Sequence, residues 1–407
     1  MKKLLLKIGC IALLCSGLVA RSAEPNMVLE WAAQATATIE TLPTPRQPRA
    51  GVMVDLAVFN ALNAIEPRYR GYGPPLEASP QALPEAAVAA AVWGVLSAEP
   101  QAEHGKLARA YTDAIARLPE GAARQAGIAL GLRAAQAVLS LRAGDGFERT
   151  EGPKPAAAAG VFQPPAGRRS GFRIDKHPLP PFGIARLEAF EPGAPPSPES
   201  DLGKRELAEV KALGARQSAN RSADQTAAAL YWNSSPPSDE HEFVKTLLAV
   251  NPLPPLETAR LLALLSMSDF DSRLLGSLLK LKYQRWRPQT AISSEFTPAA
   301  QRDANWEPLM RTPSDPEYPS GYGLWAGTAD ALYPLMQPKT LQRFNSATGQ
   351  TRSWASVDAL ATEMVNSRVW GGVHFRSSVE AGRRLGRQVA EEILATQLQP
   401  LVRASGN

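Results

Sequence analysis

The chain has 407 residues, 44% of them hydrophobic, and its 44 Lys and Arg residues exceed its 39 Asp and Glu residues by a formal charge of +5. This length suffices for one large domain or two ordinary ones. So small a charge excess gives no bulk electrostatic reason for binding nucleic acid or a membrane surface.

The first 22 residues are predicted to be a secretory signal peptide. Three lysines precede an apolar run over residues 8–20, which is too short to span a bilayer. The small residues Ala20 and Ser22 predict cleavage near Ser22 and release to the periplasm or the medium. Cleavage removes four basic residues and both cysteines, so the mature chain carries a net charge of +1. Disulfides, thiol catalysis and Cys-zinc sites are thereby excluded.

Helical periodicity dominates the mature chain, and convincing alternating strands are absent. Residues 23–235 are predicted to form an N-terminal helical layer, with helices at 27–39, 52–65, 86–96, 105–118, 122–141, 202–213 and 223–232. Within this layer, residues 144–199 are rich in Pro, Gly and charge and form one long loop. We interpret the loop as solvated, the alternative being a lid over a site. No apolar stretch after residue 22 is long enough to cross a membrane.

Residues 236–407 are predicted to form the core that carries the functional site. Helices are expected there at 238–250, 256–281, 319–333, 354–369 and 378–397. Lys280 and Arg287 are seven residues apart, so on one continuous helix they would project from nearly the same face, with Pro288 ending that helix. Two cations on one face repel each other unless an anion lies between them. The fold class expected for the whole is an all-α multi-helix bundle.

Three short segments in this part of the chain resemble a known signature. They are Lys280 to Pro288, the run Pro319-Ser320-Gly321-Tyr322, and the stretch from Ser367 to Ser378. In this order they are similar to the signature of the vanadium-dependent haloperoxidases and type 2 phosphatidic acid phosphatases, and closest to bacterial, secreted haloperoxidase-like members. The signature residues retained are Lys280, Arg287, Pro288, Pro319, Ser320, Gly321, Ser367, Arg368 and His374. Tyr322 stands where the family has His, and Ser378 stands where it has Asp.

The resemblance implies an oxyanion site that takes vanadate as cofactor, or phosphate in its place. The implied oxyanion-binding residues are Lys280, Arg287, Ser320, Gly321 and Arg368. Two arginines suit bidentate contacts, and a backbone N–H at a helix start favours an anion. His374 is implied to be the one protein ligand of vanadium in a haloperoxidase, or the nucleophile that becomes a phosphohistidine in a phosphatase.

The two departures fall on implied catalytic positions. Tyr322 can donate a hydrogen bond, but with a reference pKa near 10 it is a poor base at neutral pH. Ser378 can hold a histidine tautomer but brings no charge. Each lost acid–base group weakens catalysis by about 10²–10⁴-fold, while anion binding by the retained cations should survive better. The other histidines are interpreted as structural or solvated: His104, His177 and His241.

Three functions therefore remain open. The first is a haloperoxidase-like protein that uses hydrogen peroxide and halide. The second is an acid phosphatase acting on a phosphomonoester, and the third, of another class, is a degenerate oxyanion-binding protein without turnover. The family favours an enzyme. Neither nucleic acid nor a membrane is expected as a partner, and both a monomer and a homo-oligomer are compatible with the sequence.

Overall fold

The computed structural model describes residues 26–43, 46–77, 79–145, 149–151, 156–165, 167, 173–175, 179–233, 240–345 and 347–401. Helices dominate this part of the chain, which confirms the predicted all-α fold class. Among the described helices, none combines the length and apolarity needed to cross a bilayer. The predicted signal peptide lies outside the described residues.

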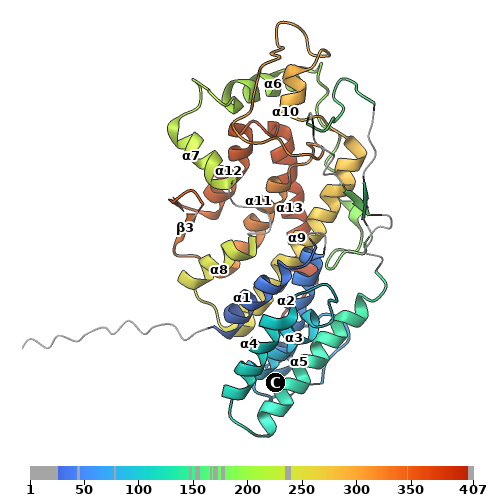
Figure 1. The fold of residues 1–407 in the computed structure, drawn as a ribbon, viewed down its shortest axis with the longest axis vertical. Coiled ribbons are helices and arrows are strands. Elements are labelled where there is room, and N and C mark those ends of the chain that lie inside the picture. The colour runs from blue at the N-terminus through green and yellow to red at the C-terminus, as the bar shows by residue number, and fades with distance from the viewer. Residues whose placement is uncertain are drawn as a thin grey trace, which may run out of the picture.

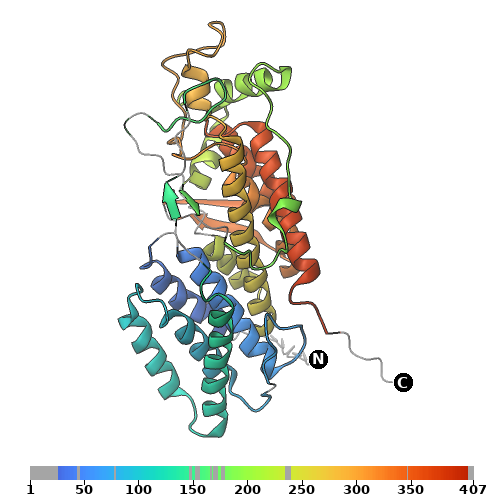
Figure 2. The ribbon, with the colours of Figure 1, turned by 90° about the vertical axis from the view of Figure 1, so that its right-hand side faces the viewer.

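The helices occupy two ends of an elongated molecule (Figure 1). One end holds α1 (Met27–Ile39), α2 (Gln47–Ile65), α3 (Pro84–Leu96), α4 (His104–Arg117) and α5 (Ala122–Leu141). The other holds α6 (Asp201–Gly214), α7 (Ala223–Asn233), α8 (Glu240–Val250), α10 (Pro288–Ser293), α11 (Gly321–Leu332), α12 (Val357–Trp370) and α13 (Arg376–Thr396). The long helix α9 (Pro255–Tyr283) connects them, because it packs on α2 at one end and on α11 and α13 at the other. Figure 2 shows α9 and α13 running side by side.

Helices α6 and α7 pack against α12, and α6 also packs against α10 and α13. Both helices precede residue 236, yet they lie with the C-terminal helices in Figure 1. The predicted division of the chain at residue 235 stays a prediction. Helix α6 therefore lies close enough to the functional site to contribute side chains to that site.

Helices α11 and α13 pack in close contact, and glycines make that approach possible. The facing glycines are Gly323, Gly327, Gly382 and Gly386. A Cβ atom on Gly386 would lie 1.9 Å from the carbonyl oxygen of Leu324, so only glycine lets the two backbones come so near. The crossing brings the start of α11 to the first turn of α13, where the Ser320 N–H donates to the Ser378 carbonyl at 3.2 Å.

Two small antiparallel ribbons accompany the helices in the described residues. β1 (Arg149–Glu151) pairs with β2 (Arg173–Asp175), and β3 (Leu341–Asn345) pairs with β4 (Gln350–Trp354). The periodicity predicts a helix from residue 354. Trp354 instead ends β4, and α12 begins after Ser356, whose side chain accepts a hydrogen bond from the N–H of Ala359 at 3.0 Å.

Part of the Pro- and Gly-rich loop is fixed to the bundle. The buried carboxylate of Asp271, in the middle of α9, accepts hydrogen bonds from the backbone N–H groups of Phe182, Gly183 and Ile184 at 2.7, 2.7 and 3.0 Å. Burial raises the pKa of Asp271 to about 6, although these donors favour its ionised form. The prediction of a solvated loop is therefore wrong for residues 182–184. His177 lies outside the described residues.

Candidate functional site

Lys280 and Arg287 come together without sharing a helix. Helix α9 ends at Tyr283, where Gln284 takes a left-handed conformation (φ 46°) and its N–H caps the carbonyl of Lys280. Arg287 directly precedes α10, and Pro288 is the first residue of that helix. The predicted common helix face is thus wrong, because the chain turns at Gln284 before it reaches Arg287.

A carboxylate of the chain lies between these two cations. Asp315 Oδ2 is 2.8 Å from Lys280 Nζ, and Asp315 Oδ1 is 2.8 Å from Arg287 Nη2. Burial opposes ionisation of Asp315, but the charges of Lys280 and Arg287 outweigh it and hold the pKa of Asp315 well below its usual range. Burial lowers the pKa of Lys280, partly offset by Asp315. An anion that enters between the cations must compete with Asp315.

Arg368, in the last turn of α12, is only 6% exposed. Its guanidinium lies over the ring of Tyr322, 4.1 Å from the centroid. Its Nε and Nη1 atoms are buried, and within the described residues they have no hydrogen-bond partner. The Tyr322 hydroxyl points elsewhere and donates to the carbonyl of Trp232 at 2.8 Å. Tyr322 therefore meets the site with its ring, and its hydroxyl serves a different contact.

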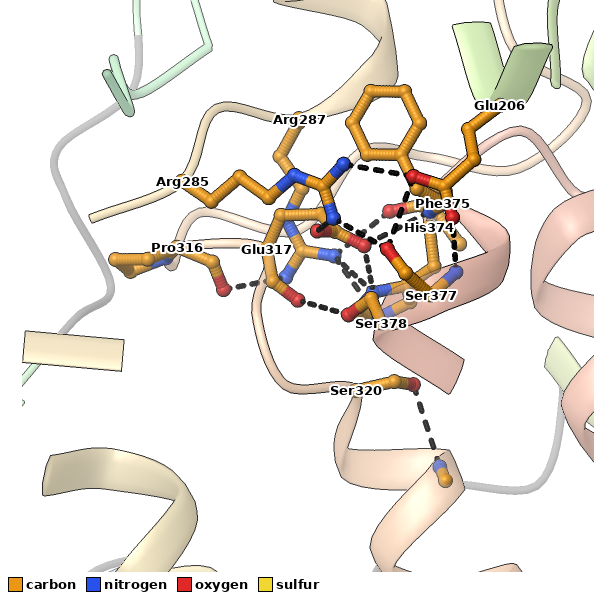
Figure 3. Close-up of polar contacts among 12 residues, drawn as sticks. Glu206, Arg285, Arg287, Pro316, Glu317, Ser320, His374, Phe375, Ser377 and Ser378 are labelled. Atoms are coloured by element: carbon orange, nitrogen blue, oxygen red, sulfur yellow. Dashed lines mark hydrogen bonds and ion pairs between the residues drawn. The ribbon is translucent and has the colours of Figure 1, made fainter. Parts of the chain in front are cut away.

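His374 lies between a carboxylate and a cation (Figure 3). Its Nδ1 is 2.9 Å from Glu317 Oε1, and its Nε2 is 3.0 Å from Arg287 Nη1. Because a carboxylate accepts and a guanidinium only donates, these contacts select the tautomer with the proton on Nδ1 and the lone pair on Nε2. Burial, together with the charges of Arg287, Lys280 and Arg368, lowers the pKa of His374 well below its usual value. The imidazole is neutral at pH 7.

The remaining predicted residues surround the start of α11. Ser320 is fully buried and its Oγ accepts a hydrogen bond from the N–H of Gly323 at 3.3 Å, which caps the helix. At Gly321 a Cβ atom would meet nothing within 4 Å, so there is open space beside this first helical residue. Ser378 Oγ donates to the carbonyl of Glu317 at 3.0 Å and is 3.5 Å from His374 Nδ1. Ser378 thus supports the Glu317 backbone more closely than it supports the imidazole.

The structure brings the four predicted charged or imidazole residues into one cluster: Lys280, Arg287, Arg368 and His374. It also adds Asp315 and Glu317, which sequence reasoning missed. Both flank Pro316, just before the Pro-Ser-Gly segment, and no spacing rule links them to His374. Only their position in front of that segment could have pointed to them.

Among the histidines outside the motifs, only the side chain of His104 is described, and it lies outside the cluster around His374. His104 Nε2 lies 3.1 Å from the carbonyl of Leu96 and 3.0 Å from that of Glu99, which is a structural role as predicted. The side chain of His241 and all of His177 lie outside the described residues.

Comparison with known proteins identifies the fold. Residues 260–402 match the family model described as the VCPO second helical-bundle domain. Among curated proteins, none matches the chain. A solved bacterial vanadium-dependent iodoperoxidase superimposes with a TM-score of 0.74 at 19% identity, covering 93% of this chain and 97% of that one.

A bacterial vanadium-dependent chloroperoxidase is similar in two forms, both at 17% identity. Its apo form superimposes with a TM-score of 0.63, covering 87% of this chain and 94% of that one. Its holo form gives a TM-score of 0.60 and covers 88% and 91%. The fold is that of these haloperoxidases, and the resemblance deduced from the three motifs is confirmed.

Proposed function

We propose, from the match of residues 260–402 to the VCPO second helical-bundle domain, that the chain binds a tetrahedral oxyanion, vanadate or phosphate, beside His374. With vanadate bound, the proposed activity is that of a secreted haloperoxidase consuming hydrogen peroxide and halide. The residues proposed to hold the anion are Lys280, Arg287, Ser320, Gly321, Arg368 and His374. Bound vanadate would supply Lewis-acid activation of the peroxide.

One observation carries the proposal. Arg368 is a charged group more than nine-tenths buried whose Nε and Nη1 atoms lack a hydrogen-bond partner in the described part of the chain. Leaving a buried charge uncompensated is costly. An oxyanion would accept from the guanidinium and offset that cost. The fit of the residues to vanadate or phosphate therefore rests on Arg368, whose guanidinium forms no ion pair with the described residues.

The start of α11 supports the same site. The helix is 12 residues long, and its N-terminal dipole favours an anion. Space is open beside Gly321, and Ser320 Oγ accepts from Gly323, which leaves its hydroxyl proton available to donate. The Nε2 lone pair of His374 accepts from Arg287 Nη1 at 3.0 Å in this structure, and it would bind the central atom of the anion once Arg287 donates to the anion instead.

A second candidate, phosphomonoester hydrolysis, is favoured by the tautomer of His374. With Nδ1–H held by Glu317, the Nε2 lone pair is also the correct nucleophile for in-line attack on phosphorus. What argues against efficient hydrolysis is the Tyr322 hydroxyl, which is committed to Trp232 and does not serve as a proton donor to a leaving group. Halide oxidation is therefore the first proposal.

Parallel assays test the choice. Vanadate-loaded protein is assayed for iodide and bromide oxidation by hydrogen peroxide, and vanadate-free protein for p-nitrophenyl phosphate hydrolysis. We expect halide oxidation in the wild type, its loss in His374→Ala, and wild-type rates in the matched control His104→Gln. Hydrolysis without halide oxidation would replace the first proposal by the second. Anion binding without either activity would indicate the degenerate anion-binding protein.

A further inference from the structure

We infer that Glu317 is the positioning residue of His374 and replaces the aspartate that the family has at position 378. This role rests on the proposed use of His374 at the oxyanion site. Glu317 Oε1 accepts two hydrogen bonds at 2.9 Å, from Nδ1 of His374 and from the backbone N–H of Phe375. One oxygen therefore fixes both the ring and the backbone that carries it.

The loss of the aspartate is compensated from another segment of the chain. In the family's signature the aspartate lies four residues after the histidine. Here Ser378 occupies that place, and its hydroxyl donates to the carbonyl of Glu317 at 3.0 Å. The shorter side chain leaves room for a carboxylate that arrives from residues 315–320, and it helps hold that segment in position.

Glu317 is itself held by a buried network (Figure 3). The side chain is 0% exposed, and Arg285 Nη1 lies 3.5 Å from its Oε2. Arg285 Nη2 in turn is 3.0 Å from Glu206 Oε2 on α6. The backbone is fixed as well, since the Glu317 N–H donates to the Arg285 carbonyl at 2.9 Å.

Ser377 closes the network. Its N–H and hydroxyl both donate to the carboxylate of Glu206, and its Oγ accepts from Arg285 Nη1 at 3.0 Å. Arg285 also lies over the ring of Phe375, 4.4 Å from the centroid. The orientation of His374 is thus set by a chain of contacts that runs from α6 through Arg285 to Glu317.

The charges flanking His374 have separate tasks. Asp315 pairs with the cations that would bind the oxyanion, while Glu317, two residues later, binds the opposite side of the imidazole. Removing Glu317 takes away the carboxylate that accepts from Nδ1 of His374, so the tautomer of the ring should change. A residue that only fills space would leave the tautomer as it is.

The test is nitrogen NMR of histidine-labelled protein, with the His374 ring assigned by comparison with His374→Gln among the four histidines of the chain. At pH 7 we expect the wild-type ring as the neutral Nδ1–H tautomer. Glu317→Gln should raise the Nε2–H fraction and reduce turnover by about 10–100-fold. Glu317→Gln with Ser378→Asp should restore the Nδ1–H tautomer.

The matched control is Glu209→Gln, on the same helix as Glu206 but paired with Arg376 instead. It should leave the His374 spectrum unchanged. A wild-type ring in the Nε2–H form, or a Glu317→Gln spectrum identical to the wild type, would overturn the inference, and the first outcome needs no variant to fold. Vanadate binding measured on the same samples separates the two proposals, because the tautomer can be correct in a protein that binds no oxyanion.

Discussion

At the scale of single residues, the site is a balance of charges around one imidazole. Burial and three neighbouring cations lower the pKa of His374, and Glu317 holds the opposite side of the ring. Asp315 neutralises two of the cations, but no carboxylate in the described part of the chain pairs with Arg368. The site therefore carries positive charge that an anion could neutralise, although Asp315 already neutralises part of it.

Replacing Asp315 should strengthen oxyanion binding. Asp315→Asn keeps the shape of the side chain but removes the charge that competes for Lys280 and Arg287. We expect about tenfold tighter binding of vanadate or phosphate, measured by calorimetric titration at fixed ionic strength. The control is Asp358→Asn, whose exposed side chain pairs with Arg383. Equal or weaker binding in Asp315→Asn would show that Asp315 does not compete.

The sequence alone was enough to predict the site residues that belong to a recognisable motif. Lys280, Arg287, Arg368 and His374 were predicted and come together in one cluster. Glu317 was missed because its role depends on which segment meets His374 in space, and no spacing encodes that. Tyr322 was expected to donate toward the anion, but its hydroxyl donates to Trp232, a contact that depends on the packing of α7 beside α11.

At the scale of elements, the crossing of α11 and α13 sets the site. Each helix contributes two glycines, and the backbones approach so closely that Ser320 at the start of α11 donates to Ser378 in the first turn of α13. The segment with Asp315 and Glu317 leads directly into α11. A change in this crossing should therefore move both carboxylates relative to His374.

The expected effect of a methyl group at the crossing is large. In Gly386→Ala the Cβ atom would lie 1.9 Å from the Leu324 carbonyl oxygen, so a backbone must shift. We expect the free energy of unfolding to fall by more than about 3 kcal/mol, above the usual range for overpacking, because the obstacle is backbone. The comparison is Gly51→Ala in α2, where a Cβ meets nothing within 4 Å. That variant should gain up to about 1 kcal/mol in denaturant unfolding, and a similar loss in both would refute the packing argument.

Most helices were predictable from periodicity, since α1 and α5 have the predicted bounds. The turn at Gln284 was not, because nothing in the run Lys280 to Arg287 forbids helix before Pro288, and the left-handed residue is not a glycine. The ribbon of β3 and β4 was also missed. Its strands alternate between buried and exposed positions over only five residues each, too short a pattern to separate from a helix start.

At the scale of the whole molecule, the proposed site and the residues that support it come from segments spread between α6 and α13. Glu206 comes from α6, Lys280 from α9, Arg368 from α12, and His374 from the turn before α13. An anion bound among such distant segments would couple them and stabilise the fold by mass action, by about 2.7 kcal/mol at a ligand concentration one hundred times Kd.

Calorimetric titration of orthovanadate and of phosphate into the wild type and Arg368→Ala tests this account most directly. We expect micromolar to millimolar binding to the wild type and binding at least about tenfold weaker in Arg368→Ala, because the variant removes a buried cation that no carboxylate among the described residues pairs with. Arg387→Ala, which removes an exposed arginine paired with Glu391, should bind as the wild type does. Identical heats in the wild type and Arg368→Ala, or no binding to the wild type at all, would contradict the account.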